Sequence, residues 1–300
     1  MIFLFIILAL IFPIFVSGYY LGLGIQIFIM AIFAMSLNIL VGYTGLPSLG
    51  HAAYFGVAGY ATAFLYMAGV KSFWIIVCVG IATGCVFSAL FGLLALRAHG
   101  PYFMIITLAL AQVVWGIAFK WRSLTLGDDG LPGIGRPALG IGIDLAPDPH
   151  FYYFTLAIFL VVCIALFILT NSPFGYTLKG IRESETRMRA LGYNTWFYKY
   201  LAFVFAGAFG AISGVLWVFY SGFVNPSDMA VDLSVKGLLM VILGGSGSLI
   251  GPAIGAAIIV LLENLISGYT ERWLLVLGMV YVVVIMLFSE GITSIFKRGK

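Results

Sequence analysis

The chain has 300 residues, of which 63% are hydrophobic and only 9% are charged, and its formal net charge is +4. Soluble domains carry about 25% charged residues, so this composition argues against a soluble globular enzyme or a disordered chain. The 15 basic residues are too few and too scattered for a nucleic-acid-binding surface. The composition therefore predicts an all-α integral membrane bundle, with residues 1–300 forming a single domain.

Ten apolar segments predict about ten spans, because a helix needs about 20 apolar residues to cross the hydrocarbon core of a bilayer. They lie at roughly 2–18, 21–41, 52–69, 73–96, 102–121, 151–170, 200–222, 234–246, 252–267 and 273–289. The first segment lacks a basic start and contains Pro13, so we interpret it as an uncleaved span and not a signal peptide. The segments at 52–69, 234–246 and 252–267 are short or interrupted by glycine, and we expect them to be broken or steeply tilted.

The two large loops differ in charge. The loop at about 173–199 holds five basic residues: Lys179, Arg182, Arg187, Arg189 and Lys199. The loop at about 122–150 holds two, beside four aspartates. Because basic residues favour the cytoplasmic side, we expect 173–199 inside and 122–150 outside. With ten spans, both termini are then cytoplasmic, although Lys71, Lys120 and Arg122 fall outside against the rule.

The outer loop is rich in glycine and proline, which favour turns and stop helices. We expect an irregular but compact segment. It is either a simple connector or a docking surface, and in the second case Asp128 and Asp129, in an exposed turn, are the candidate contacts.

The inner loop contains a charged stretch that predicts one short helix at about 177–191, closed by Gly192. Glu183–Arg187 and Glu185–Arg189 have the favourable i,i+4 order. This helix is either a solvated connector or the contact for a partner chain.

Several glycines predict close contacts. The GxxxG pairs Gly80–Gly84 and Gly210–Gly214 are typical of closely packed membrane helices. Glycine and serine loops at 42–52 and 244–253 resemble each other, and paired interrupted helices are typical of transporters. So short a match is compatible with an internal repeat and equally with chance.

A few polar side chains lie at membrane depth and are candidates for a translocation pathway. They are Asn38, Ser48, His51, Thr107, Gln112 and Ser213. No acidic residue is clearly placed at mid-membrane, which argues against a proton-coupled carrier. The sequence contains no HExxH, GxSxG or Walker A motif. We therefore expect no catalytic residues, no metal site and no cofactor on this chain.

The order of several short motifs identifies a family resemblance. The chain resembles the M-type (LivM-like) subunits of the branched-chain amino acid ABC transporter permease family. The matching blocks cover about residues 37–265: 37–56, Gly100-Pro101-Tyr102-Phe103, 107–109, 124–125, 127–134, Ser172-Pro173-Phe174-Gly175, 181–183, 190–194, 198–203, 222–226 and 244–252.

This resemblance implies a permease half of an importer in the plasma (inner) membrane of a bacterium or archaeon. It implies a homologous second permease, two ATPase subunits that bind ATP and Mg, and an extracytoplasmic substrate-binding protein. The implied substrates are branched-chain or related hydrophobic amino acids, with urea, amides or another small molecule as the alternative. A secondary carrier is the alternative of another class.

The resemblance also implies a coupling element for the ATPase subunits, although the full Glu-Ala-Ala triplet of the wider importer class is absent. Its residues here are Gly180, Ile181, Arg182, Glu183, Ala190, Leu191 and Gly192.

Overall fold

The computed structural model describes residues 9–13, 15–16, 18–70, 72–140, 144–269, 275 and 278–279. Almost all of the predicted span at 273–289, most of that at 2–18, and both termini lie outside these residues.

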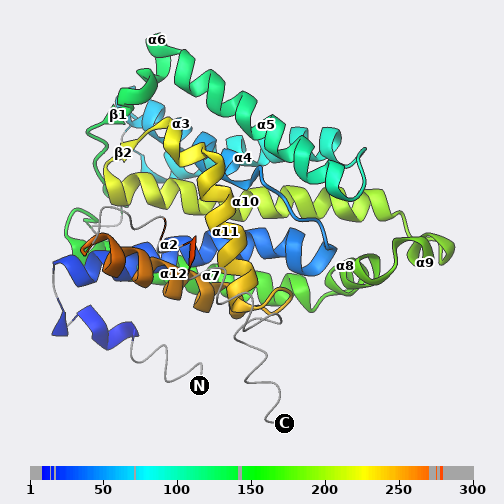
Figure 1. Ribbon diagram of the computed structural model, residues 1–300. Coiled ribbons are helices and arrows are strands. Elements are labelled where there is room, and N and C mark those ends of the chain that lie inside the picture. Colours follow the sequence, from blue (N-terminus) through cyan, green and yellow to red (C-terminus); the bar gives the residue numbers. More distant parts are fainter. Residues whose placement is uncertain are drawn as a thin grey trace.

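Five long helices lie side by side and form the body of the molecule (Figure 1). They are α2 (Tyr19–Asn38), which continues as the π-helix η1 (Ile39–Thr44), α4 (Phe73–Ala95), α5 (Pro101–Lys120), α7 (Asp148–Thr170) and α10 (Thr195–Ser221). In the described part of the chain, these five are long and apolar enough to cross a membrane. They correspond to five of the ten predicted spans.

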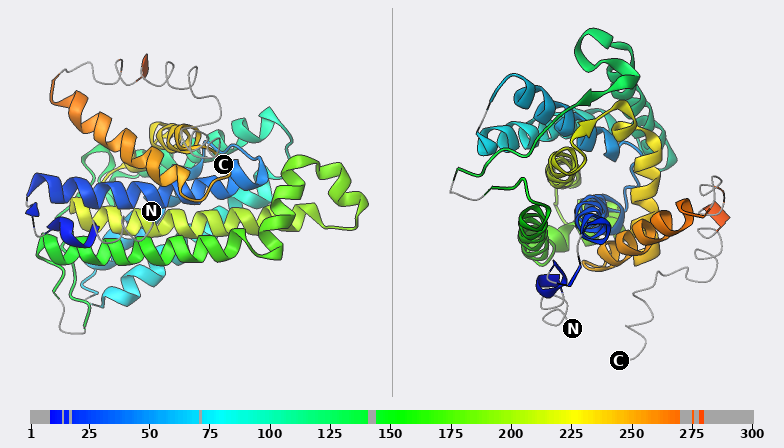
Figure 2. Two further views of the ribbon diagram at one scale, coloured as in Figure 1. Left: turned by 90° about the horizontal axis from the view of Figure 1, so that it is seen from below. Right: turned by 90° about the vertical axis from the view of Figure 1, so that its left-hand side faces the viewer.

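Two of the long helices form the centre of the bundle. In the most apolar window of the α2–η1 segment 78% of the residues are buried, and in that of α10 61%, whereas α4, α5 and α7 bury about a third or less. The end-on view shows α2 and α10 inside the ring formed by the other helices (Figure 2). The exposed, apolar faces of α4, α5 and α7 suit contact with lipid or with another membrane protein.

Three shorter helices account for the segments predicted to be broken or tilted. They are α3 (His51–Met67), α11 (Val231–Gly244) and α12 (Gly251–Ser267). Each has 17 residues or fewer, and α11 runs across the long helices instead of along them (Figures 1 and 2). A count of about ten complete spans is therefore not established.

The close packing predicted from the GxxxG pairs is confirmed. A Cβ atom on Gly84 of α4 would overlap the side chain of Ala211 on α10, and a Cβ on Gly214 of α10 would overlap the carbonyl of Phe55 on α3. Glycine at these positions lets the three backbones approach one another, which strengthens dispersion contacts where no water is available to drive association.

The outer loop forms a compact cap at one end of the bundle. It contains α6 (Arg122–Thr125), the 3₁₀ helix η2 (Gly127–Asp129) and the strand β1 (Leu131–Pro132). The strand pairs antiparallel with β2 (Phe223–Val224), with Leu131 opposite Val224. The Arg136 guanidinium donates to the carbonyls of Phe219 and Ala146 and pairs with Asp148 at 2.9 Å. These contacts tie the loop to the ends of α10 and α7.

The charged loop lies at the opposite end of the bundle, where it forms α8 (Pro173–Glu183) and α9 (Glu185–Ala190) (Figure 1). The two large loops therefore project from opposite ends, as the predicted topology requires. Which end faces the cytoplasm stays a prediction from the distribution of basic residues.

Candidate functional site

The charged segment forms two helices and not the single helix that the sequence predicted. Ser184 breaks the helix with φ −160° and ψ 100°, and its hydroxyl oxygen accepts a hydrogen bond from the Arg187 backbone N–H at 3.3 Å. Serine is a favourable N-cap because it satisfies a free N–H group of the next helix. The prediction of one helix over about 177–191 was therefore wrong. The break separates Glu183 from Arg187, and that pair is absent from the ion pairs of the described residues.

A carboxylate fastens α9 to the start of α10. Glu185 pairs with Arg189 at 2.6 Å, as predicted, and also with the buried Lys199 at 2.8 Å. The Thr195 hydroxyl donates to the same oxygen at 3.0 Å. Burial of Glu185 pushes its pKa upward, but Lys199, Arg189 and Thr195 outweigh that effect and lower the pKa to about 2. Glu185 is therefore ionised throughout the physiological pH range.

The tip of this element is apolar and exposed. Ala190 is exposed, Leu191 is 67% exposed, and Trp196 and Phe197 beside them are 40% and 48% exposed. Gly192 has φ +87° and its N–H donates to the Arg189 carbonyl at 2.9 Å, so it closes α9 in the left-handed conformation, as predicted.

The remaining residues of the predicted coupling element have different surroundings. Gly180 packs against Met188 of α9, because a Cβ at Gly180 would lie 2.8 Å from the Met188 sulfur. Ile181 is buried and Glu183 is exposed. Arg182 reaches the main bundle, where its guanidinium donates to the carbonyl of Gly42.

Arg182 contacts a place where two distant loops meet, which we call the glycine junction: Asn38, Gly42, Arg182, Gly247 and Ser248. The Asn38 amide donates to the Ser248 carbonyl at 2.8 Å, and its oxygen accepts from the Gly247 N–H at 3.0 Å. A Cβ at Gly42 would overlap both Asn38 and the Gly247 backbone. The two glycine-rich loops whose sequences resemble each other thus contact one another, and α8 is bonded to their contact.

Four of the other predicted pathway residues are packed inside the bundle. Ser48, His51, Thr107 and Ser213 are fully buried. His51 Nε2 lies 2.7 Å from the Ser36 hydroxyl, Thr107 accepts from the Leu49 N–H at 3.2 Å, and Ser213 donates to the Gly210 carbonyl at 2.6 Å. These bonds connect helices or satisfy polar groups.

The last two groups of predicted residues lie on the surface. Gln112 is exposed on the outward face of α5, in a shallow groove with Lys120 and Trp121. Asp128 and Asp129 are exposed on η2, in the loop at the far end of the bundle from α9. Their role in docking stays a prediction.

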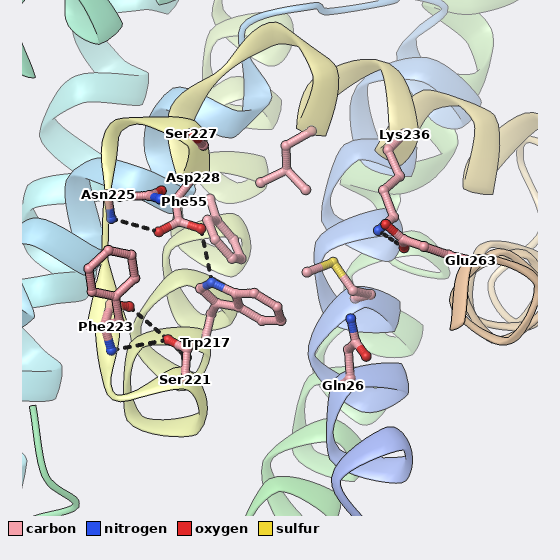
Figure 3. Close-up of a pocket in the computed structure, with 12 residues that line it drawn as sticks. Gln26, Phe55, Trp217, Ser221, Phe223, Asn225, Ser227, Asp228, Lys236 and Glu263 are labelled. Carbon is pink, nitrogen blue, oxygen red and sulfur yellow. Dashed lines mark hydrogen bonds and ion pairs between the residues drawn. The ribbon is translucent and has the colours of Figure 1, made fainter. Parts of the chain in front are cut away.

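A cavity of about 330 Å³ opens among α2, α3, α10, α11, α12 and the 3₁₀ helix η3 (Pro226–Met229), in the half of the bundle that carries β1 and β2. Figure 3 shows Asp228 and Trp217 on one wall and Lys236, Glu263 and Gln26 on the other. We call this space the outer cavity. None of the six predicted pathway residues, all of them described, is among the residues that line it.

The charged groups of the outer cavity are hydrogen-bonded or ion-paired. Asp228 accepts from the Trp217 indole N–H and from the Asn225 backbone N–H, both at 3.0 Å. Lys236 of α11 forms an ion pair with Glu263 of α12. Burial raises the pKa of the Asp228 carboxyl to about 6, against the opposing effect of its hydrogen bonds. Asp228 is therefore mostly ionised at pH 7.

Sequence reasoning missed this cavity. It did not single out Asp228, Lys236 or Glu263 as functional residues. A local signal existed, because asparagine at a helix N-cap with aspartate three positions later forms a capping box, which is present at Asn225 and Asp228.

Five long apolar helices packed side by side, with polar loops at the two ends, define a multi-pass membrane protein. In the described residues, no group of three or more His, Cys, Asp or Glu side chains could hold a metal ion. Residues 19–288 match the family described as "Branched-chain amino acid transport system / permease component". The chain belongs to this family of ABC transporter permeases.

Individual relatives agree with this assignment. The chain is 27% identical to the high-affinity branched-chain amino acid transport system permease protein LivM of Salmonella typhimurium, over 96% of this chain and 73% of that protein. It is 26% identical to the permease protein LivH of Escherichia coli, over 87% of this chain and 90% of that protein. These relatives are named as transport permeases and not as enzymes.

A solved structure, "PsaBC from Streptococcus pneumoniae in complex with Fab", aligns with 93% of this chain and 95% of its own at 15% identity and a TM-score of 0.48.

Proposed function

We propose that this chain is one permease half of an ABC importer for branched-chain or related hydrophobic amino acids. It forms half of the translocation pathway and works by alternating access, driven by separate ATPase subunits. Residues 1–300 act as a single transmembrane domain in the cell inner membrane, with α8, α9 and both termini on the cytoplasmic side.

The observation that carries this proposal is the arrangement of α8 and α9. The two helices project from one end of the bundle and present an apolar tip at Ala190 and Leu191, while Glu185 and Arg182 bond their base to the bundle. An exposed apolar tip on an element that is bonded to the bundle suits insertion into a groove on another protein. The partner that fits is an ATPase subunit, because the chain has no Walker A motif of its own.

The glycine junction offers a route for coupling. A ligand shifts a conformational equilibrium only if it binds one state more tightly than the other. ATP would do so if the ATP-bound ATPase subunits favoured one position of α9 over another. Since Arg182 of α8 is bonded to Gly42, a displacement of α8 would reach η1 and the loop between α11 and α12 together.

The remaining partners follow from the two ends and the outer surface. A homologous second permease, or a second copy of this chain, would pack against the exposed apolar helices. An extracytoplasmic substrate-binding protein would dock on the opposite end, at Asp128 and Asp129. ATP and Mg would be bound by the two ATPase subunits.

The substitution Ala190→Glu tests this proposal, because it places an unpaired charge at the docking tip. Removing one side chain of a buried charge pair costs about 2–5 kcal/mol. A penalty of that order would release the ATPase subunit from α9. We expect the permease to insert and to pair with its homologue, while the ATPase subunits co-purify at least tenfold less and substrate no longer stimulates ATP hydrolysis.

The matched control is Ala146→Glu, the same substitution at an exposed alanine in the loop at the opposite end. It should leave ATPase association unchanged. Normal transport by Ala190→Glu with its ATPase subunits still bound would show that α9 is not the coupling element.

A further inference from the structure

We infer that the outer cavity is a substrate site of the permease itself, in which Asp228 selects molecules that carry an ammonium group. This inference rests on the proposed function and deepens it, because it assigns part of the substrate choice to this chain and not only to a binding protein.

The charges of the outer cavity leave one negative group without a cationic partner. Lys236 and Glu263 neutralise each other on one wall. On the other wall, Asp228 takes both of its hydrogen bonds from neutral donors, and the ion pairs of the described residues do not include it. A carboxylate that has lost part of its contact with water is costly unless a cation pairs with it. A ligand that brings an ammonium group therefore gains free energy at this wall.

The rest of the lining suits the other parts of an amino acid. Phe55, Trp217, Met30 and Leu233 supply an apolar surface for an aliphatic side chain, and the Trp217 ring can also attract a cation through its face. The Lys236 ammonium has three N–H donors, so it can bond the carboxylate of a ligand while it stays paired with Glu263. About 330 Å³ lies at the lower end of the range for ligand pockets, about 300–1,000 Å³.

This combination separates two substrate classes that the sequence left open. A small zwitterion with an apolar side chain uses the carboxylate, the lysine and the apolar wall together. Urea and simple amides bring no cation to Asp228 and no aliphatic group to Phe55 and Trp217. The outer cavity therefore fits an aliphatic amino acid better than a neutral amide.

A labelling experiment tests the site without relying on transport. Ser227 is exposed and lines the cavity, so Ser227→Cys gives a thiol that a methanethiosulfonate reagent can reach. The experiment uses the complete permease–ATPase complex without the binding protein, so that only the permease can discriminate. Leucine should slow labelling at least fivefold. The compound 2-hydroxy-4-methylpentanoate, which replaces the ammonium group with a hydroxyl, should not, and neither should urea or acetamide.

Variants identify the residue responsible. Adding Asp228→Asn should raise the leucine concentration needed for protection at least tenfold. Asp232→Asn, a matched change at an exposed aspartate outside the cavity, should leave it unchanged. The comparison of leucine with the hydroxy acid remains decisive even where Asp228→Asn fails to fold.

Equal protection by leucine and the hydroxy acid, or unchanged protection in Asp228→Asn, would overturn the role of Asp228. No protection by leucine would overturn the site. A parallel measurement of ATP-driven leucine uptake by the unmodified complex, with the binding protein present, distinguishes failure of this inference from failure of the proposed function. Uptake without protection rejects only this inference, whereas absence of both uptake and ATPase association rejects the proposed function.

Discussion

Single side chains hold the proposed coupling element in place. Glu185 is the central one, because its carboxylate is shared by Arg189, Thr195 and the buried Lys199. Its pKa is lowered to about 2 from the ordinary value of 4.5. A carboxyl whose pKa is depressed by folding contributes stability above its unfolded pKa and loses it as the pH falls through the folded pKa.

The lowered pKa of Glu185 predicts how the attachment of α9 depends on pH. The attachment of α9 to α10 should be nearly constant from pH 8 to pH 5, weaken as the pH falls below 4.5 and be lost as the pH nears 2. Between pH 5 and pH 8, Glu185→Gln should loosen this attachment by about 1–2 kcal/mol, because hydrogen bonds to a charged group are worth about 1.5–3 kcal/mol and Glu185 is partly exposed. The mobility of a spin label at Thr186→Cys measures this attachment.

The exposed Glu183 provides the control, since it makes no ion pair among the described residues. Glu183→Gln should leave the label's mobility unchanged. Equal mobility in Glu185→Gln and the unsubstituted protein would show that the Glu185 bonds do not hold α9.

What sequence could predict at this scale was local. The Glu185–Arg189 pair follows from i,i+4 spacing, and the left-handed Gly192 follows from its place at a helix end. Lys199 lies 14 positions from Glu185, and Trp217 lies 11 positions from Asp228 in a different element. Such contacts depend on how helices pack, which no local pattern contains.

At the scale of helices and loops, the sequence predicted some features and missed others. Shortness and glycine interruptions correctly marked α3, α11 and α12 as unusual. They did not show that α11 runs across the bundle, because hydrophobic periodicity gives a helix but not its direction. The break at Ser184 was missed because the sequence on both sides of it favours a helix, and the cap was recognisable only as one serine among several polar residues.

The glycine junction yields a prediction at the level of elements. Gly42→Ala would force η1 away from the 244–250 loop, because its Cβ would overlap Asn38 and the Gly247 backbone. Overpacking of this kind costs about 1–3 kcal/mol. We expect a lower thermal unfolding midpoint for the purified permease and weaker stimulation of ATP hydrolysis by substrate.

Gly116→Ala is the matched control, since a Cβ at this helical glycine of α5 meets no atom within 4 Å. Its unfolding midpoint should be unchanged or slightly higher, because alanine favours helix more than glycine does. A Gly42→Ala variant as stable as Gly116→Ala, with ATP hydrolysis stimulated equally by substrate, would show that the glycine junction has no role in coupling.

The molecule as a whole has two chemically different ends joined by an apolar bundle. One end carries a compact glycine- and proline-rich cap and the outer cavity, and the other carries α8 and α9 (Figure 1). Composition predicted the membrane bundle, and the ordered motifs predicted the permease family. The outer cavity needed the structure, since its walls come from segments as far apart as Gln26 and Glu263.

The most direct test of the account is the energy source of transport. The permease, its homologue, the ATPase subunits and the binding protein are reconstituted in vesicles, and uptake of labelled leucine is measured with and without ATP on the side of α8 and α9. We predict uptake that requires ATP, withstands an uncoupler, and is lost in Ala190→Glu but not in Ala146→Glu. Uptake that continues without ATP and is abolished by an uncoupler would contradict the account and identify a secondary carrier.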